Sequence, residues 1–195
     1  MPVRKSNVEM RCGWAVGVPD SYVEYHDHEW AVPVRDDLAL FERVCLEGFQ
    51  SGLSWWTILS RREAFREAFQ GFDPKVVATF SEAKIAELRL DARIIRHEGK
   101  IRAAIGNAKA TLALGPSGLS ELIWSHQPAI SARPTAAGQV PAKTAESVAL
   151  AKALKATGFG FVGPTTAYAL MQACGLVNDH VVGCMAGDRR AVSVP

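Results

Sequence analysis

The architecture of this chain is set by the segment Thr144-Ala-Glu-Ser-Val-Ala-Leu-Ala-Lys-Ala-Leu-Lys-Ala-Thr157-Gly158-Phe-Gly-Phe-Val-Gly163-Pro164 and by the apolar run that follows it to Cys174. Thr144 is a favourable N-cap, and the apolar residues after it repeat at three- and four-residue spacings, which predicts a helix over 145–157. The glycines and Pro164 then predict a turn, and a second helix over 165–174 ends at Gly175. The segment therefore predicts two helices joined by a short glycine-bearing hairpin.

Such a hairpin can present unpaired backbone N–H groups at the start of its second helix. Because those amides and the helix dipole both favour an anion, the hairpin is a candidate phosphate-binding site. The candidate contacts are Gly158, Gly160, Gly163 and Thr165. Lys152 and Lys155 on the first helix can add positive charge. A plain helix–turn–helix packing unit explains the same pattern, so the segment alone leaves both interpretations open.

Helical periodicity extends over most of the remaining chain. Apolar residues at helical spacings follow Asp36 and Ser54, Asp73 and Ser81 are favourable N-caps, and a further helix ends at Gly115-Pro116. The predicted helices cover 36–50, 54–69, 73–77, 81–88 and 100–114. The Pro- and Gly-containing stretch 134–143 predicts a surface loop. Alternating strand patterns are essentially absent, so the fold class is all-α.

Composition restricts the class of protein. The 195 residues are 48% apolar and 22% charged, which is ordinary for a globular protein of one or two small domains. No apolar run is long enough to cross a bilayer, and the first residues lack the apolar core of a secretion signal. Four cysteines without a dense disulfide framework suit a reducing cytoplasm. The net charge of +2 permits an anionic partner without demanding one.

Two Cys and His pairs stand near opposite ends of the chain. Cys12 and His26 lie near the start, and His180-Val-Val-Gly-Cys184 lies near the end. Together they would make a Cys2His2 set, which suits tetrahedral zinc in a structural role and leaves no position open for water. Free cysteines are also commonly buried as core residues, and the long gap matches no compact zinc finger. Spacing alone therefore does not decide between a metal site and a core.

Aromatic residues and one acid are concentrated in the first third of the chain. The aromatic side chains are Trp14, Tyr22, Tyr25, Trp30, Trp55 and Trp56. Core packing accounts for most buried Trp and Tyr, but stacking faces beside a polar group also suit a flat base taken out of DNA. Glu47 lies near the end of an apolar helix beside Gly48, where a carboxylate can face a pocket. A solvated acid at a helix end is the alternative interpretation.

Several segments together resemble the bacterial 3-methyladenine DNA glycosylase I family, over nearly the whole chain from Arg11 to Cys184. The matching segments include Arg11-Cys-Gly-Trp14, Tyr25-His-Asp27, Glu29-Trp30, Cys45-Leu-Glu-Gly48, Gly52-Leu-Ser-Trp55, Ile94-Ile-Arg96, Gly99-Lys-Ile101, Asn107-Ala108, Phe161-Val-Gly163 and Met171-Gln-Ala-Cys-Gly-Leu-Val-Asn-Asp-His-Val181. The resemblance implies a helix-hairpin-helix fold whose hairpin spans about 145–175. It also implies a helical domain over 11–187, with flexible ends at 1–10 and 188–195.

The resemblance also implies the ligands and the pocket. It makes Cys12, His26, His180 and Cys184 the ligands of one structural zinc ion per chain. It assigns Glu47 and Tyr25 to the catalytic pocket with Trp55, and places Tyr22, Trp14 and Trp30 around the base. The expected partners are double-stranded DNA carrying alkylated adenine and the released 3-methyladenine, with a monomeric enzyme in the cytoplasm.

Three positions bear on geometry and mechanism. The family usually has glycine at Ala31 and often at Arg93, so a positive φ at either position would cause strain. Related helix-hairpin-helix glycosylases carry a catalytic Asp two residues before a His, where this chain has Asn178. We therefore expect hydrolysis to rely on substrate charge, without a general base at that position. No lysine stands where a Schiff-base nucleophile is expected, which predicts a monofunctional enzyme.

The residues alone permit functions of different classes. A DNA N-glycosylase is favoured. A non-enzymatic, zinc-stapled DNA-binding module would use the same hairpin but release no base. A metal-dependent hydrolase with Glu47 activating a zinc-bound water needs an open coordination position, which four protein ligands deny.

Overall fold

The computed structural model describes residues 10–129 and 132–191, and all regular structure within those ranges is helical. The helices are α1 (Asp20–Glu24), α2 (Asp37–Gln50), α3 (Trp55–Leu59), α4 (Arg62–Ala68), α5 (Pro74–Val77), α6 (Glu82–Leu90), α7 (Glu98–Leu114), α8 (Gly118–Trp124), α9 (Ala145–Ala156), α10 (Pro164–Ala173) and α11 (Met185–Ala191). A turn of π-helix at Tyr25–Glu29 continues α1. The predicted all-α class is therefore confirmed.

Side-chain caps fix most of the helix starts that the sequence predicts. Each cap accepts a hydrogen bond from a backbone N–H in the first turn, as Asp36 does from Ala39. The capping residues are Asp36, Ser54, Asp73, Ser81 and Thr144. At the start of α9, Thr144 and Ser147 form a reciprocal capping box. These starts are therefore confirmed as predicted.

The structure differs from the predicted elements in several places. The single helix expected over 54–69 is two, because the chain leaves helical geometry at Arg61 between α3 and α4. The sequence analysis missed α1 and α8, which begin after Pro19 and Ser117 without any side-chain cap. Helix α11 was likewise not among the predicted helices.

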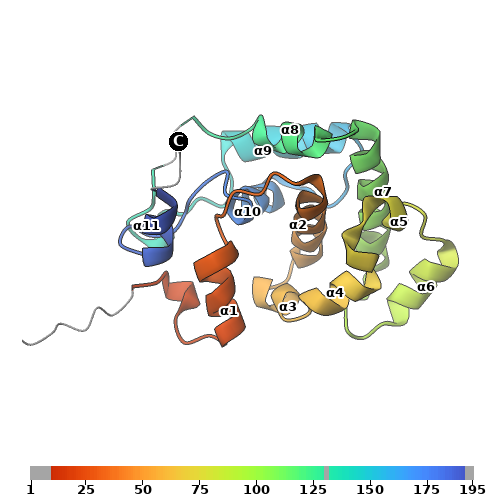
Figure 1. Cartoon of the computed structure of the whole chain (residues 1–195), viewed down its shortest axis with the longest axis horizontal. Coiled ribbons are helices and arrows are strands. Elements are labelled where there is room, and N and C mark those ends of the chain that lie inside the picture. The colour runs from red at the N-terminus through yellow and green to blue at the C-terminus, as the bar shows by residue number, and fades with distance from the viewer. Residues whose placement is uncertain (1–9, 130–131, 192–195) are drawn as a thin grey trace, which may run out of the picture.

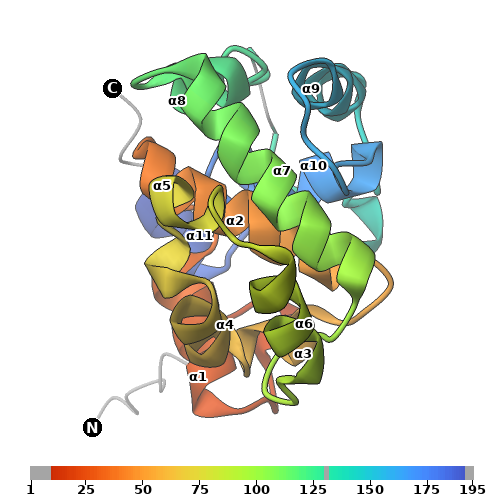
Figure 2. The same cartoon turned by 90° about the vertical axis from the view of Figure 1, so that its right-hand side faces the viewer.

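Helix α2 lies at the centre of the molecule, and the other helices are arranged around it. It packs against α3, α7, α8 and α10, and eight of its residues are buried. Figure 2 shows the long helix α7 running diagonally across α2, with α9 and α10 beside it. The hairpin pair α9 and α10 is in close contact. This packing fixes the last turn of α2 and the exposed end of α10 relative to each other.

The two ends of the described chain lie together. Figure 1 shows α11 beside the N-terminal segment and α1, at one end of the molecule. The N–H of Met185 donates to the backbone oxygen of Met10 at 3.1 Å. The flexible ends expected from the sequence fall largely on residues 1–9 and 192–195, which lie outside the described residues. No described helix combines the length and apolar character needed to cross a membrane.

The two departures from family glycines have different outcomes. Ala31 has a φ of 60°, a left-handed conformation that favours glycine. It is held there by a bond from its N–H to the oxygen of Gln172 at 3.1 Å. Arg93 has no positive φ, and its guanidinium pairs with Asp91 and Glu67. Of these two positions, Ala31 is therefore the one whose backbone is strained.

Candidate active site

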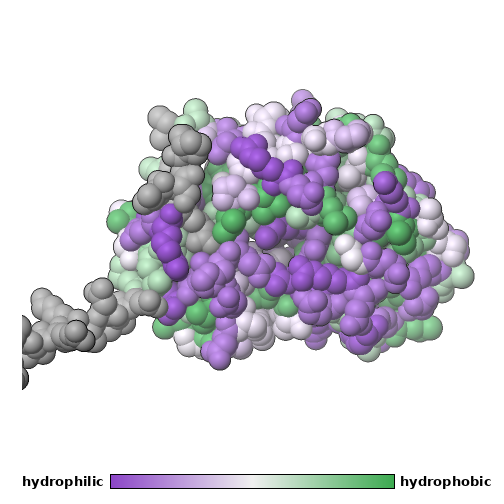
Figure 3. Space-filling model, in the orientation of Figure 1, coloured by the Kyte–Doolittle hydropathy of each residue, from purple (hydrophilic) through white to green (hydrophobic). Residues whose placement is uncertain are grey.

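A cavity of about 300 Å³ lies where α2, α10, α1 and α3 meet. In the space-filling view of Figure 3, a hollow lies near the centre of a largely hydrophilic face. The side chains lining the cavity are mainly aromatic and aliphatic, with a few polar groups among them. They are Cys12, Trp14, Tyr22, Tyr25, Trp30, Glu47, Gln50, Trp55, Ala137, Val140, Ala169, Gln172, Asp179 and Val181. An apolar cavity with a few polar groups is typical of a small-molecule site.

Glu47 supplies a buried carboxyl group from the last turn of α2. Its side chain is 5% exposed, and its Oε2 has no hydrogen-bond partner among the described residues. Burial raises the pKa of Glu47 to about 8, and the distant charge of Arg43 only partly opposes this. A buried carboxyl group without a partner is costly unless something binds it. Glu47 is thus prepared for a ligand that brings a positive charge or a donor.

Trp55 and Tyr25 stand beside this carboxyl group. Trp55 is the first residue of α3, and its indole Nε1 is buried without a hydrogen-bond partner among the described residues. The Tyr25 ring lies 5.2 Å from the Trp55 ring and is 3% exposed. Burial raises the pKa of the Tyr25 hydroxyl well above its usual value, and the charge of the nearby Glu47 adds a smaller increase. The phenol is therefore neutral and can donate a hydrogen bond.

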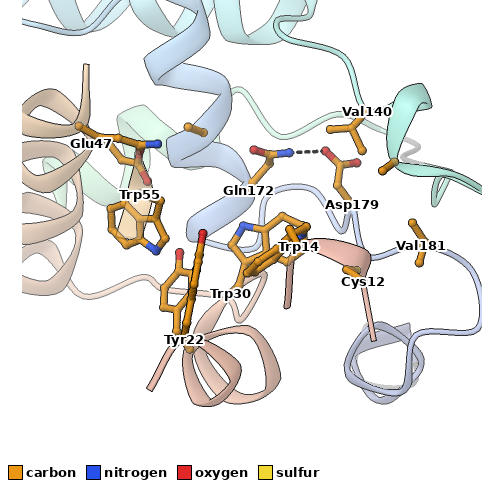
Figure 4. A pocket seen from close by; sticks show the side chains of 14 residues that line it. Cys12, Trp14, Tyr22, Trp30, Glu47, Trp55, Val140, Gln172, Asp179 and Val181 are labelled. Carbon is orange, nitrogen blue, oxygen red and sulfur yellow. Dashed lines mark hydrogen bonds between the residues drawn. The ribbon is translucent and has the colours of Figure 1, made fainter. Parts of the chain in front are cut away.

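Tyr22, Trp14 and Trp30 form a second aromatic wall, and Figure 4 shows Trp14 and Trp30 below Gln172, with Tyr22 to their left below Trp55. Tyr22 stacks on Trp56 at 5.6 Å and lies 5.4 Å from Trp14. Trp14 and Trp30 meet edge to face at 5.0 Å. The structure thus brings every predicted base-pocket residue to one cavity. It also adds Gln50, Gln172 and Asp179, which the sequence analysis did not single out for this site.

Cys12, His26 and Cys184 form a buried group directly behind that wall. One ligand atom of each lies within 4.8 Å of the others, and Cys184 Sγ is 3.6 Å from His26 Nε2. Trp14 packs on the His26 ring at 4.8 Å. Two thiols and an imidazole suit a soft divalent ion. The group can therefore hold a metal ion that joins the N-terminal to the C-terminal segment.

His180, the fourth predicted ligand, lies beside this group and outside it. Its ring is 4.8 Å from the His26 ring, and its Nε2 lies 3.3 Å from the backbone oxygen of His26. Its Nδ1 is 2.9 Å from Oδ1 of Asn178, and this amide oxygen can accept a hydrogen bond from a protonated Nδ1. A proton on Nδ1 leaves a lone pair on Nε2. The structure thus gathers three of the four predicted ligands and places the fourth next to them.

Asp27 orients the other histidine. Its Oδ1 lies 2.7 Å from His26 Nδ1, and the Nε of Arg11 donates to its carboxylate at 2.9 Å. Burial raises the pKa of Asp27, but the bonds from Arg11 and His26 outweigh it and lower that pKa to about 2. A carboxylate behind a histidine fixes the ring so that the other nitrogen faces a metal. The sequence analysis gave Asp27 no role, although it stands next to His26 in the segment Tyr25-His-Asp27.

The hairpin between α9 and α10 offers fewer free amides than the sequence analysis expected. The N–H of Gly158 donates to the oxygen of Lys155 at 3.0 Å, and the N–H of Gly160 donates to Oδ1 of Asn107 at 2.7 Å. These two predicted phosphate contacts are therefore engaged inside the protein. Gly163 and Thr165 remain at the start of α10, where the first N–H groups have no partner within the helix.

The chain is similar to known proteins. The family model of methyladenine glycosylases matches residues 14–187. DNA-3-methyladenine glycosylase 1 of Escherichia coli is 51% identical over 179 residues, covering 89% of this chain and 95% of the relative.

Two solved structures are also similar. A 3-methyladenine DNA glycosylase I crystal structure has a TM-score of 0.86 and 46% identity, covering 90% of this chain and 98% of the other. A Tyr-to-Phe variant of such an enzyme, in complex with 3-methyladenine, has a TM-score of 0.83 and 32% identity, covering 91% and 97%. The chain therefore belongs to the methyladenine glycosylase family.

Proposed function

We propose that this chain is a DNA-3-methyladenine glycosylase, which hydrolyses the bond between N3-methylated adenine and deoxyribose in damaged DNA. Its family membership and its 51% identity to the E. coli enzyme support this function. The observation that carries it is Glu47, a buried carboxyl group whose Oε2 has no partner among the described residues and which faces an aromatic cavity.

The substrate explains why the site needs little conventional acid catalysis. A 3-methylated adenine is cationic, so its bond to the sugar is already weakened and the base leaves as a neutral molecule. The enzyme mainly has to bind the extruded base and stabilise charge in the transition state. A negative Glu47 beside the faces of Trp55 and Tyr25 favours a flat cation. Normal adenine lacks that charge and gains less from the same site.

Each predicted pocket residue has a place in this proposal. Glu47 accepts a hydrogen bond from the base and Tyr25 donates one, while Trp55 stacks on the ring. Tyr22, Trp14 and Trp30 close the opposite side of the pocket. The cavity is lined by no lysine in the described part of the chain, which supports a monofunctional hydrolase without strand cleavage.

We further propose that zinc occupies the Cys12, His26 and Cys184 group, with His180 as the fourth ligand. The soft donors, and the His180 ring 4.8 Å from the His26 ring, support this choice. Four protein ligands leave no position for a reacting water, so the metal is structural. We also propose that Gly163 and Thr165 at the start of α10 contact a DNA phosphate, since that end of the helix favours an anion. Because its substrate is chromosomal, we place the enzyme in the cytoplasm, acting as a monomer.

The test is release of 3-methyladenine from methylated duplex DNA. Wild-type protein is expected to release the base, whereas Glu47→Gln should reduce the rate by about 100-fold, because the group that favours the cation is lost. Glu42→Gln is the matched control, because Glu42 lies on the same helix and pairs with Arg66 away from the cavity. Tight binding to DNA without base release would instead identify a DNA-binding module.

A further inference from the structure

A second buried carboxylate lies on the wall of the cavity, and the function described so far leaves it without a role. Asp179 is 5% exposed and follows α10 in the chain. Figure 4 shows it across the cavity from Glu47, with Gln172 between the two. The cavity therefore has an acidic group at each end.

The hydrogen bonds of Asp179 hold one oxygen and leave the other available. The Tyr168 hydroxyl donates to Oδ2 at 2.6 Å, and Nε2 of Gln172 donates to the same atom at 2.8 Å. Tyr168 and Gln172 are one turn apart on α10, so they present their donors on the same face of the helix. Within residues 10–129 and 132–191, no hydrogen bond reaches Oδ1 of Asp179. These two hydrogen bonds orient the carboxylate through Oδ2 and leave Oδ1 able to contact a ligand.

The adjacent residue is not equivalent. The side chain of Asn178 donates to the backbone oxygen of Gly187 at 3.2 Å and lies 2.9 Å from Nδ1 of His180. It does not line the cavity. The position at which the sequence comparison located a missing catalytic acid is thus a structural one, and the next residue presents a carboxylate to the site.

We propose that Asp179 is a further catalytic residue, acting on the sugar side of the bond that is cleaved. This inference rests on the proposed glycosylase function. When Glu47 and Trp55 hold the base at one end of the cavity, the remaining end, at Asp179, receives the deoxyribose. As the C1′–N bond breaks, its electron pair neutralises the base and positive charge develops on the sugar. The free Oδ1 of Asp179 stabilises that charge and accepts a hydrogen bond from the attacking water.

The atoms balance without any other reagent. The water oxygen bonds to C1′, its surplus proton passes to solvent, and the products are a neutral base and a sugar hydroxyl. A second cavity of about 390 Å³ lies on the other side of Asp179 and Tyr168. Its lining includes Arg133, Thr144 and Glu146, so it is polar enough to hold water. Water can reach Asp179 from this side while the base fills the first cavity.

The experiment compares base release with base binding in Asp179→Asn. We expect the single-turnover rate of 3-methyladenine release from methylated duplex DNA to fall about 100-fold. The Kd for free 3-methyladenine, followed by tryptophan fluorescence, should stay within about threefold, because the free base carries no sugar. Asp36→Asn is the matched control: it makes the same chemical change at an exposed helix cap, where Asn also caps well.

Two outcomes would overturn the role of Asp179. One is a D179N rate within about threefold of wild type, and the other is a weakening of base binding that matches the loss of rate. If D179N does not fold, Tyr168→Phe decides, since it removes only the bond to Oδ2. It should slow base release about fivefold with unchanged base binding, and an unchanged rate contradicts the proposal. A wild-type chain that releases no base overturns the proposed function itself, whereas an active wild type beside an unimpaired D179N overturns this role alone.

Discussion

At the scale of single residues, Glu47 shows how a binding site is maintained at a cost to stability. Its pKa of about 8 means that the folded protein binds a proton there more tightly than an unfolded chain with the ordinary value of 4.5. The charged carboxylate, which would attract a cation, is therefore the form that makes the free protein less stable. On the proposed role of Glu47, a bound cationic base would offset that cost and favour the charged form, so burial both destabilises the lone carboxylate and favours a cationic ligand.

The first prediction is that Glu47→Gln stabilises the free protein in a pH-dependent way. The contribution of Glu47 to stability is fully present below pH 4.5 and is lost as the pH rises to about 8, because the folded state retains the proton and the unfolded state releases it. The glutamine does not titrate. The difference in unfolding free energy between variant and wild type should therefore grow from pH 4.5 to 8 and then level off, at no more than about 5 kcal/mol.

Urea unfolding of both proteins across this pH range provides the measurement. Glu42→Gln is the control, and its difference from wild type should not follow the same curve, because its carboxylate pairs with Arg66. A difference that is constant from pH 5 to 8 would mean that Glu47 is charged in the empty site.

At the scale of helices, the end of α2 depends on a buried lysine from α7. The Nζ of Lys100 donates to the backbone oxygens of Phe49 and Ser51, at 2.8 and 2.6 Å. These carbonyls lie at the C-terminus of α2, where the helix leaves its last oxygens unpaired. A cation is also favourable at that end of the helix dipole. Lys100 thus fixes the turn that carries Glu47 and Gln50 into the cavity.

We therefore predict that Lys100→Met destabilises the protein by about 2–4 kcal/mol, because it leaves two carbonyl oxygens without their donor. Lys109→Met, on the exposed face of the same helix, should change stability by less than about 0.5 kcal/mol. Chemical denaturation of the two variants measures the contrast. Equal stability would show that water replaces the ammonium group.

Gly175, just beyond the end of α10, is required for a close approach of two backbones. It has a φ of +76°, and a Cβ there would lie 2.6 Å from the nitrogen of Pro33. The same contact holds the chain at Val34, whose N–H donates to the oxygen of Cys174 at 3.0 Å. Larger side chains are excluded at this position by both conformation and space.

The corresponding prediction compares two glycines. Gly175→Ala should cost about 2–5 kcal/mol, from the left-handed conformation together with the backbone clash. Gly106→Ala should stabilise by about 0.5–1 kcal/mol, because a Cβ at that position of α7 meets open space. Thermal unfolding of both variants tests the contrast, which fails if Gly175→Ala melts at the wild-type temperature.

Whether a helix begins at a side-chain cap largely determines whether the sequence could predict it. Helices α2, α3, α5, α6 and α9 begin at a side-chain cap, which is a local signal. Helices α1 and α8 have no such cap, and Ser117 precedes α8 with a φ of 60°, so tertiary packing determines where they start. The hairpin was predicted, but Asn107 engages the amide of Gly160 from a distant part of the chain, which no local pattern reveals.

At the scale of the whole molecule, the candidate site is assembled from segments far apart in the sequence. Glu47 and Trp55 could be predicted because they lie close together on either side of a glycine turn. Asp179 could not be separated from Asn178 by sequence, because a shift of one residue decides which side chain faces the cavity and which faces Gly187. Hydrogen bonds from Tyr168 and Gln172 of α10 to Asp179 determine which of the two side chains faces the cavity.

The buried group of Cys12, His26 and Cys184 joins the two ends of the chain next to the pocket. Trp14 and Trp30 line the cavity, and they pack on His26 and His180 at 4.8 and 4.5 Å. Arg133 holds the C-terminal loop from outside, donating to the backbone oxygens of His180 and Val181. A substitution at Cys184 should therefore change the packing of Trp14 and Trp30.

The last prediction concerns removal of the metal. Chelation of the wild-type protein should lower its unfolding free energy by an amount on the order of 5 kcal/mol, since metal binding and folding are coupled. It should also change the tryptophan emission, because Trp14 and Trp30 pack on the group. Cys184→Ser should resemble the chelated wild type and respond no further to chelator, which separates loss of the metal from loss of a thiol in the core. Base release should fall together with folding, because the proposed metal is structural and takes no part in the proposed reaction. A chelated protein that remains fully folded yet releases no base would contradict a structural metal and would place the ion in the chemistry itself.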